Sequence, residues 1–219
     1  MSDEVAIRRA TWLFRQRGYT TWREDAIGAV VPLGRSRPDF LVETSARERL
    51  FVEAKAFEKE SVLRTIKSRV FSLAHMSLQK RVNRLVADAA KQTLEYARYG
   101  FPIVIALDNW RQVGVHLDEE SLTSLFGEAE LQITIDPSTG AQVGSKQLVR
   151  KDDGSPLYDG KNKHVSAVVV VLPCQRFDTI ERDDDFTIER PMKVRIIRNE
   201  DATHPLSAAV FNGADDVEY

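Results

Sequence analysis

Cysteine is nearly absent from this chain, and histidine is scarce. The single cysteine, Cys174, cannot form an intramolecular disulfide, and it follows an apolar run as a small buried residue would. The four histidines are scattered, without the spacing or the cysteine partners of a zinc site. The sequence thus predicts neither a disulfide framework nor a zinc site.

Long apolar stretches and glycine-rich phosphate-binding loops are also missing. No run approaches the roughly 18 apolar residues of a membrane span, and the N-terminus lacks the apolar segment of a signal peptide. We therefore expect a cytoplasmic protein that makes no contact with a membrane. No Walker-type loop is present, so we expect no nucleotide-driven motor in this sequence.

Charge of either sign is in little excess. The formal net charge of −2 gives no global attraction to nucleic acid, so any DNA binding must come from a local basic patch. With 42% hydrophobic and 29% charged residues, the composition is that of a soluble globular protein. The chain has 219 residues and no repeat or linker, which predicts a single domain over residues 1–219.

The most informative stretch is 37–55, in which two short apolar runs flank a charged turn. Its β-branched and aromatic residues predict a hairpin with strands at 39–43 and 49–55. A turn centred on Ala46 makes paired residue numbers sum to 92. Three opposed pairs follow: Asp39 with Glu53, Leu41 with Phe51, and Glu43 with Arg49.

The first of these pairs sets two carboxylates face to face. Opposed side chains have Cβ atoms roughly 5 Å apart, and like charges at that distance are destabilising. The arrangement costs stability unless a cation sits between Asp39 and Glu53, and a divalent metal would meet that need. Because side chains alternate along a strand, Lys55 lies on the same face as both acids.

Pro38-Asp39, followed by Glu53-Ala54-Lys55 in the next strand, resembles the PD-(D/E)xK signature of restriction-endonuclease-like nucleases. The resemblance implies that Asp39, Glu53 and the Ala54 carbonyl bind Mg²⁺ or Mn²⁺, and that Lys55 activates the attacking water. Mg²⁺ prefers such hard oxygen ligands. The motif alone also fits an exposed hairpin whose charges form salt bridges.

A second pattern resembles RecB-like nucleases and the N-terminal nuclease domain of type I restriction motor subunits. Gln92 and Tyr96 are four residues apart on a predicted helix, so they share one face, and a strand with a polar end follows. In such proteins the Gln and Tyr lie beside the metal site, and the first helix often adds an acid. Glu4 is the candidate for that acid, with Glu24 as the alternative. The resemblance covers residues 3–110.

Periodicity predicts the remaining elements of this half of the chain. Apolar spacing predicts a helix at 3–17, and a first strand is expected at 26–31. The run at 61–99 predicts two helices with a break at 75–77, and an apolar strand follows at 103–107. Together these elements give an α-β-β-β-α-β core, the order that the restriction-endonuclease-like resemblance implies.

The predicted helices at 61–99 have a basic outer face. Its cations are Arg64, Lys67, Arg69, Lys80, Arg81, Arg84 and Lys91. A solvated face is the ordinary interpretation, and contacts with phosphates are the alternative.

The second half of the chain, 111–219, is interpreted as an extension of the same sheet. We expect a helix at 118–126, a hairpin at 131–149, a loop at 151–163, and strands at 165–172, 186–189 and 192–197.

These patterns lead to the hypothesis of an α/β, Mg²⁺-dependent nuclease that hydrolyses DNA phosphodiester bonds. Defence against foreign DNA, a homodimer, and association with a separate motor or defence protein are further expectations from the resemblance. A protein that kept the fold but lost catalysis, and that only binds nucleic acid or protein, is the alternative. An unrelated binding protein with a coincidental hairpin is a third.

Overall fold

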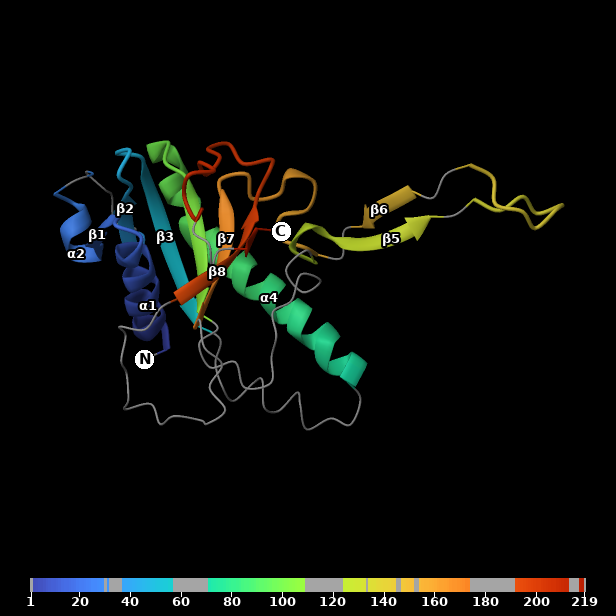
Figure 1. The fold of residues 1–219 in the computed structure, drawn as a ribbon, viewed down its shortest axis with the longest axis horizontal. Coiled ribbons are helices and arrows are strands. Elements are labelled where there is room, and N and C mark those ends of the chain that lie inside the picture. Colours follow the sequence, from blue (N-terminus) through green and yellow to red (C-terminus); the bar gives the residue numbers. More distant parts are fainter. Residues whose placement is uncertain are drawn as a thin grey trace.

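The structure is a computed structural model in which a mixed sheet is flanked by helices (Figure 1). It describes residues 2–29, 31, 37–56, 71–108, 124–132, 134–144, 147–151, 154–173, 192–212 and 217–218. The helices are α1 (Ser2–Gln16), α2 (Glu24–Ile27) and α4 (Phe71–Thr93), with 3₁₀ segments η1 (Leu94–Tyr99), η2 (Ser124–Phe126) and η3 (Tyr158–Gly160). The α/β class expected from the sequence is confirmed.

The main sheet has seven strands, in the order β1-β2-β3-β4-β7-β8-β9. These strands are β1 (Thr20–Arg23), β2 (Phe40–Glu43), β3 (Arg49–Ala56), β4 (Ile103–Asp108), β7 (Ala167–Pro173), β8 (Met192–Arg198) and β9 (Val217–Glu218). Strands β3, β4 and β7 are parallel to one another. The pairs β1–β2, β2–β3 and β7–β8 are antiparallel, and β9 runs parallel to β8. The carboxyl ends of β1, β3, β4 and β7 and the amino ends of β2 and β8 therefore lie at one edge.

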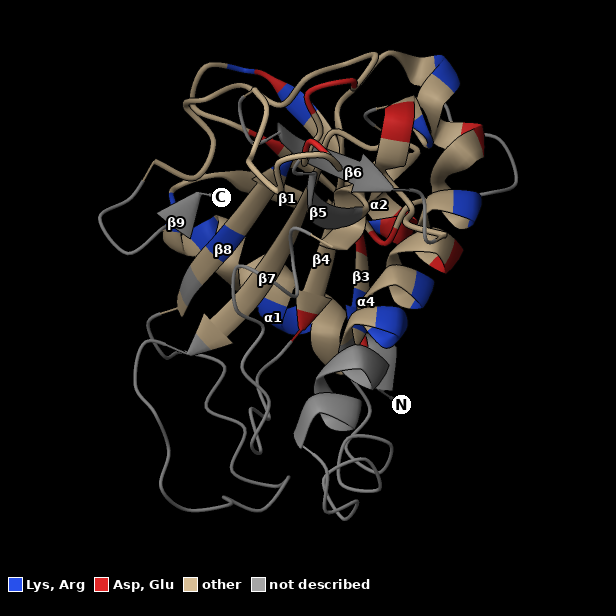
Figure 2. Cartoon of the chain, turned by 90° about the vertical axis from the view of Figure 1, so that its right-hand side faces the viewer, with Lys and Arg blue, Asp and Glu red and all other residues tan. Residues whose placement is uncertain are grey.

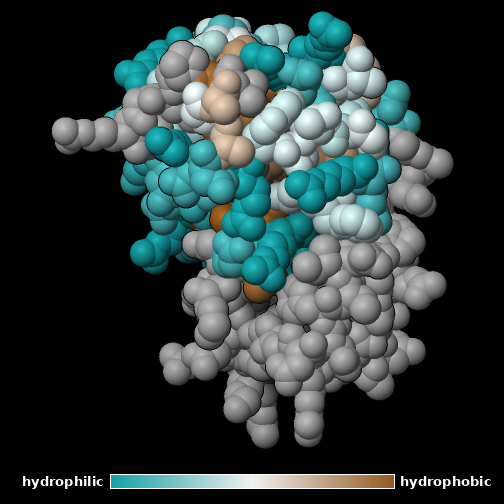
Figure 3. All heavy atoms as spheres, turned by 90° about the vertical axis from the view of Figure 1, so that its left-hand side faces the viewer, coloured by the Kyte–Doolittle hydropathy of each residue, from teal (hydrophilic) through white to brown (hydrophobic). Residues whose placement is uncertain are grey.

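The helices cover both faces of the sheet (Figure 2). On one face, the apolar side of α1 packs against alternate residues of β2, β3, β4 and β7, such as Val52 and Val104. On the other face, α4 packs against the intervening residues, among them Ile105 and Leu107. Helix α2 and η1 extend this second layer over Leu41 and Phe51. Many of the described residues visible from the side on which α2 lies are hydrophilic (Figure 3).

Helix α1 confirms the helix expected at 3–17. Its stripe of Ala6, Ala10, Leu13 and Phe14 is buried, as the apolar spacing predicts. Gly18 closes the helix with a φ of 77°, a left-handed conformation that glycine adopts without a steric penalty.

The first strand lies earlier than the sequence predicts. The strand expected at 26–31 is wrong: β1 occupies Thr20–Arg23, and Glu24–Ile27 forms α2. The β-branched and aromatic residues of β1 suit a strand, while the acids Glu24 and Asp25 favour the first turn of a helix. The apolar residues after Asp25 are buried against the sheet rather than paired within it, as Ile27 shows.

The break expected at 75–77 is also wrong, because α4 runs through these residues without interruption. No proline or glycine occurs there, so nothing forces the backbone out of the helix. The change comes at Thr93 instead, where the α-helix tightens into η1 and then ends at Gly100 in a left-handed conformation. Residues 61–70 lie outside the described residues, as do Arg64, Lys67 and Arg69.

In the second half, the sheet extends as expected through β7 and β8, which match the strands predicted at 165–172 and 192–197. The predicted hairpin does not join it, because β5 (Glu128–Gln132) and β6 (Gln147–Lys151) form a separate two-stranded sheet (Figure 1). Of the helix expected at 118–126, the described part is only η2, and the loop at 151–163 contains η3. The strand expected at 186–189, Cys174, and residues 109–123 lie outside the described residues.

The described helices are short or carry charged residues along their length. None of them combines the length and the apolar character that crossing a bilayer requires.

Candidate active site

The hairpin of β2 and β3 has the register that the sequence predicts. Leu41 pairs with Phe51 and Glu43 with Arg49, so paired residue numbers sum to 92. The Glu43 carboxylate accepts a hydrogen bond from Arg49 Nε at 2.8 Å across the two strands. Extended by one residue beyond β2, this register sets Asp39 opposite Glu53, at the edge where β3 and β4 end.

Asp39 is held at the end of β2 by the backbone of the next strand. Its Oδ2 accepts a hydrogen bond of 2.7 Å from the Ala54 N–H. A backbone N–H that points at a carboxylate gives a short, charge-assisted bond. The Asp39 side chain thus takes the place of a ladder carbonyl and is fixed beside β3.

Glu53 and Lys55 form an ion pair on β3, with 2.9 Å between Lys55 Nζ and Glu53 Oε1. Their side chains are only 7% and 15% exposed, respectively. Phe51, which shares their face by alternation, packs against Tyr96 in an edge-to-face contact at 5.9 Å. Glu53, one of the two carboxylates for which a cation was expected, is thus paired with Lys55 in this structure.

Ala54 points the other way. Its methyl group is fully buried in the α1-facing core, between the two site residues that face α4. Its backbone remains beside Asp39, where the N–H makes the hydrogen bond described above.

Tyr96 reaches the site through the chain that precedes Asp39. It is buried, and its hydroxyl donates a short hydrogen bond to the Arg37 carbonyl, two residues before Asp39. Tyr96 thereby helps to fix the entry of the chain into β2.

Gln92 does not accompany Tyr96. Gln92 is exposed, so the expected shared face is not observed. The reason is the change of pitch at Thr93, since a 3₁₀ turn has 3.0 residues instead of 3.6 and rotates the following side chains relative to those of α4.

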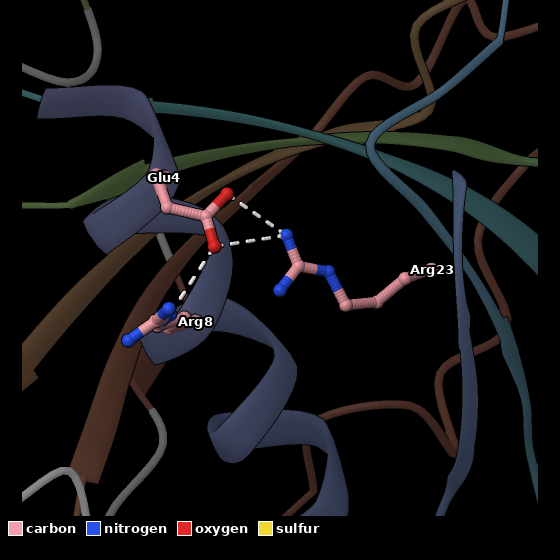
Figure 4. Close-up of polar contacts among 3 residues, drawn as sticks. All are labelled: Glu4, Arg8 and Arg23. Atoms are coloured by element: carbon pink, nitrogen blue, oxygen red, sulfur yellow. Dashed lines mark hydrogen bonds and ion pairs between the residues drawn. The ribbon is translucent and has the colours of Figure 1, made fainter. Parts of the chain in front are cut away.

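Glu4, expected to join the two acids, is engaged elsewhere. Both of its carboxylate oxygens accept hydrogen bonds from Arg23 Nη2, at 2.9 and 3.1 Å, and Oε1 also accepts one from Arg8 at 3.2 Å (Figure 4). The hydrogen bond from Arg23 is the main reason that the pKa of Glu4 lies below its usual value. Arg23 pairs with Phe40, whose side chain packs on the α1 side of the sheet, opposite to that of Glu53.

Glu24, the alternative to Glu4, is exposed in the first turn of α2. Its backbone carbonyl accepts a hydrogen bond from Arg37 Nη1 at 3.3 Å. Glu24 thus contacts the segment before Asp39 through its backbone carbonyl, not through its carboxylate, in the contact that the structure describes.

Arg9 and Asp108 form a further ion pair at this edge, which the sequence did not reveal. Arg9 Nη1 lies 2.7 Å from Asp108 Oδ2, and the two side chains are 4% and 6% exposed. Asp108 ends β4 and is paired in register with Ala56, on the α1 face. The sequence shows that a polar residue, Asp108, ends an apolar strand. Nothing in the sequence indicates that its partner, Arg9, comes from α1.

Asp39 and Glu53 are the residues that could hold a divalent cation. In the described part of the chain, no three His, Cys, Asp or Glu side chains are grouped as a metal site. Mg²⁺ requires fewer protein ligands, because it usually keeps several waters and takes one or two carboxylates. Two hard carboxylates at one strand edge meet that requirement without Glu4.

Comparison of the chain with protein-family models, with curated proteins and with solved structures finds no match.

Proposed function

We propose that the protein is a divalent-metal-dependent nuclease of the PD-(D/E)xK type, with a restriction-endonuclease-like core, and that it hydrolyses DNA phosphodiester bonds. One observation carries the proposal: the β2–β3 register, extended by one residue, sets Asp39 opposite Glu53, with Lys55 two residues further on the same face of β3. The site lies where the parallel strands β3 and β4 end, a common position for ligand binding in α/β sheets.

Asp39 and Glu53, with the Ala54 carbonyl, would hold Mg²⁺ or Mn²⁺. When bound, such an ion polarises a phosphoryl oxygen and lowers the pKa of a water molecule. The protein contributes the position of the ligands: the Ala54 N–H orients the Asp39 carboxylate, and the strand fixes Glu53.

Lys55 would orient the attacking water and contact the phosphate. Its ammonium lies 2.9 Å from Glu53 and is largely removed from solvent, so its charge acts at close range. Lysine suits this task because it delivers a compact charge on a flexible stem. Tyr96 would act indirectly, by fixing the segment before Asp39 through the Arg37 carbonyl.

The exposed cations of α4 would provide part of the DNA-binding surface (Figure 2). Arg84 and Lys91 are 85% and 80% exposed, and each lies 3.9 Å from Asp88, a long distance for an ion pair. Such exposed pairs are weak, so these cations can exchange Asp88 for a phosphate.

A catalytically inactive binding module is the second candidate, and one observation favours it. The carboxylates of Asp39 and Glu53 already have protein partners in Ala54 N–H and Lys55 Nζ, so neither requires a metal to be paired. In that case the protein would bind nucleic acid or protein through the same surfaces. Both candidate functions are compatible with the same partners, which are a second copy of the chain or a separate motor or defence protein.

The test is incubation of the purified protein with linear, circular and single-stranded DNA in the presence of Mg²⁺ or Mn²⁺. We expect wild type to cleave and the Asp39→Asn variant to lose at least about 100-fold in rate. The amide side chain of this variant is isosteric with the carboxylate and still accepts the bond from Ala54, so folding should persist. Asp25→Asn, which removes an exposed acid from α2, is the matched control.

The two candidates separate on a second measurement, the thermal unfolding of wild type with and without the metal. A ligand that binds only the folded protein raises its Tm. Stabilisation by Mg²⁺ or Mn²⁺ together with cleavage supports the nuclease. Absence of both rejects it in favour of the binding module.

A further inference from the structure

Arg23 lies at the same strand edge as the candidate site, on the other face of the sheet. It is the last residue of β1, and it pairs with Phe40, the residue that directly follows Asp39. The carboxylates of Asp25 and Asp39 add to the effect of Glu4 in raising the pKa of Arg23. The guanidinium thus stands within electrostatic reach of the proposed metal ligand Asp39.

The Arg23 guanidinium is oriented by Glu4, but not all of its N–H donors are engaged. Only Nη2 contacts Glu4, and Glu4 is in turn held by Arg8 one turn further along α1 (Figure 4). Among the described residues, Nε and Nη1 of Arg23 make no hydrogen bond. Arginine has five donors and keeps its charge at every physiological pH, so three N–H groups remain for a ligand.

The guanidinium is accessible from solvent. The Arg23 side chain is 42% exposed. A cation that is exposed, oriented by a carboxylate and provided with remaining donors is suited to bind phosphate.

We propose that Arg23, oriented by Glu4, binds a backbone phosphate of the DNA substrate, at a position next to the phosphate that is attacked. The proposal rests on the nuclease function proposed above, and it gives Glu4 a positioning role instead of a role as metal ligand. Because Arg23 faces α1 and Lys55 faces α4, the two cations contact different phosphates of one strand that passes over the sheet edge. Arg23 therefore contributes to affinity and to the placement of the substrate.

The test is the affinity for duplex DNA as a function of salt concentration, measured without divalent metal so that no cleavage occurs. Each phosphate contact contributes about 0.9 to the slope of log K against log salt. We expect Arg23→Gln to flatten that slope by about one unit and to raise KM for cleavage more than it lowers kcat. Arg15→Gln, which removes an equal charge further along α1, should leave both unchanged.

The variant Glu4→Gln tests whether Glu4 orients Arg23 or only contributes a negative charge near the DNA. If Glu4 only repels DNA, its neutralisation strengthens binding, whereas loss of the Arg23 anchor weakens it. We expect weaker binding, with a Tm close to that of wild type because the pair is exposed.

Each outcome decides. If Arg23→Gln has the salt slope and the KM of wild type, the inference about Arg23 is wrong. Cleavage of DNA by wild type in the same experiment would still support the proposed nuclease. A wild-type protein that neither binds nor cleaves DNA overturns both.

Discussion

Two nearly buried ion pairs lie at the same edge of the sheet, one on each face. Arg9–Asp108, at 2.7 Å, lies on the α1 face, and Lys55–Glu53, at 2.9 Å, lies on the α4 face. Arg9–Asp108 joins a helix to a strand 99 residues away in the sequence, whereas Lys55–Glu53 lies within one strand.

We use this difference to distinguish the pair expected to stabilise the fold from the pair that belongs to the proposed site. A pair between distant elements is formed only on folding and fixes α1 on the sheet. The Lys55–Glu53 pair joins residues of one strand, and it places a second carboxylate opposite Asp39, where two like charges would cost stability without their cationic and N–H partners. The Lys55 face is therefore the one to which we assign the proposed nuclease site, and we expect the Arg9–Asp108 pair to anchor α1.

The largest effect is expected from Lys55→Ala. The variant should lose about 10²- to 10⁴-fold in DNA cleavage, because the group that orients the water is gone. The metal-induced rise in Tm should persist, since Asp39 and Glu53 are retained. Gel assays of cleavage and thermal unfolding with Mg²⁺ measure the two effects.

Lys91→Ala, which removes an exposed lysine from α4, is the control for Lys55→Ala and should cleave at saturating DNA like wild type. Loss of the metal-induced shift in Lys55→Ala would contradict the separate roles of the lysine and the two acids.

The other side of the comparison is tested by Arg9→Met. This variant removes the guanidinium 2.7 Å from the buried Asp108 carboxylate, and we expect the free energy of unfolding to fall by about 3–5 kcal/mol. Urea-induced unfolding measures the loss.

Arg8→Met is the matched control for Arg9→Met, because the adjacent arginine is 56% exposed and should contribute no more than about 1 kcal/mol. The double variant Arg9→Met with Asp108→Leu should recover part of the stability, since buried pairs can be replaced by apolar residues at little cost. A single variant as stable as Arg8→Met would remove the structural role assigned to this pair.

The smallest effect on the molecule itself is expected at exposed cations. Replacing Lys80 and Arg84 together by Ala should change the free energy of unfolding by less than about 0.5 kcal/mol. If α4 contacts DNA, the salt slope of binding should flatten by up to about two units, with turnover at saturating DNA unchanged.

The double variant Lys161→Ala with Lys163→Ala removes the same charge from the loop around η3 and serves as comparison. A slope flattened by the loop variant and not by the α4 variant would move the DNA path to that loop.

The core of the candidate site could be predicted because it depends on contacts that are local in sequence. Alternation along two short strands and a turn centred on Ala46 fix which residues face each other, and the observed register agrees. The same holds for α1, where apolar spacing and Gly18 define the helix and its end.

Elements without a strong period were predicted less well. Residues 20–31 contain β-branched, acidic and apolar groups in close succession. The apolar residues at 26–31 predict a strand, but in the structure Ile27 belongs to α2 and packs against the sheet. The prediction that Gln92 and Tyr96 share one helix face was wrong because it assumed the same helical pitch on both sides of Thr93. In both cases packing against the sheet decided the conformation, and packing is not visible in a single segment.

The sequence by itself determined the hairpin, the alignment of Asp39, Glu53 and Lys55, and the α/β class, because strand and helix periods are properties of neighbouring residues. Only the tertiary structure decided that Arg9 pairs with Asp108, that Glu4 orients Arg23, and that Tyr96 bonds the chain before Asp39. Those contacts depend on the order of strands in the sheet and on which helix covers which face. Both are set by the burial of apolar surface over the whole chain, which no local pattern encodes.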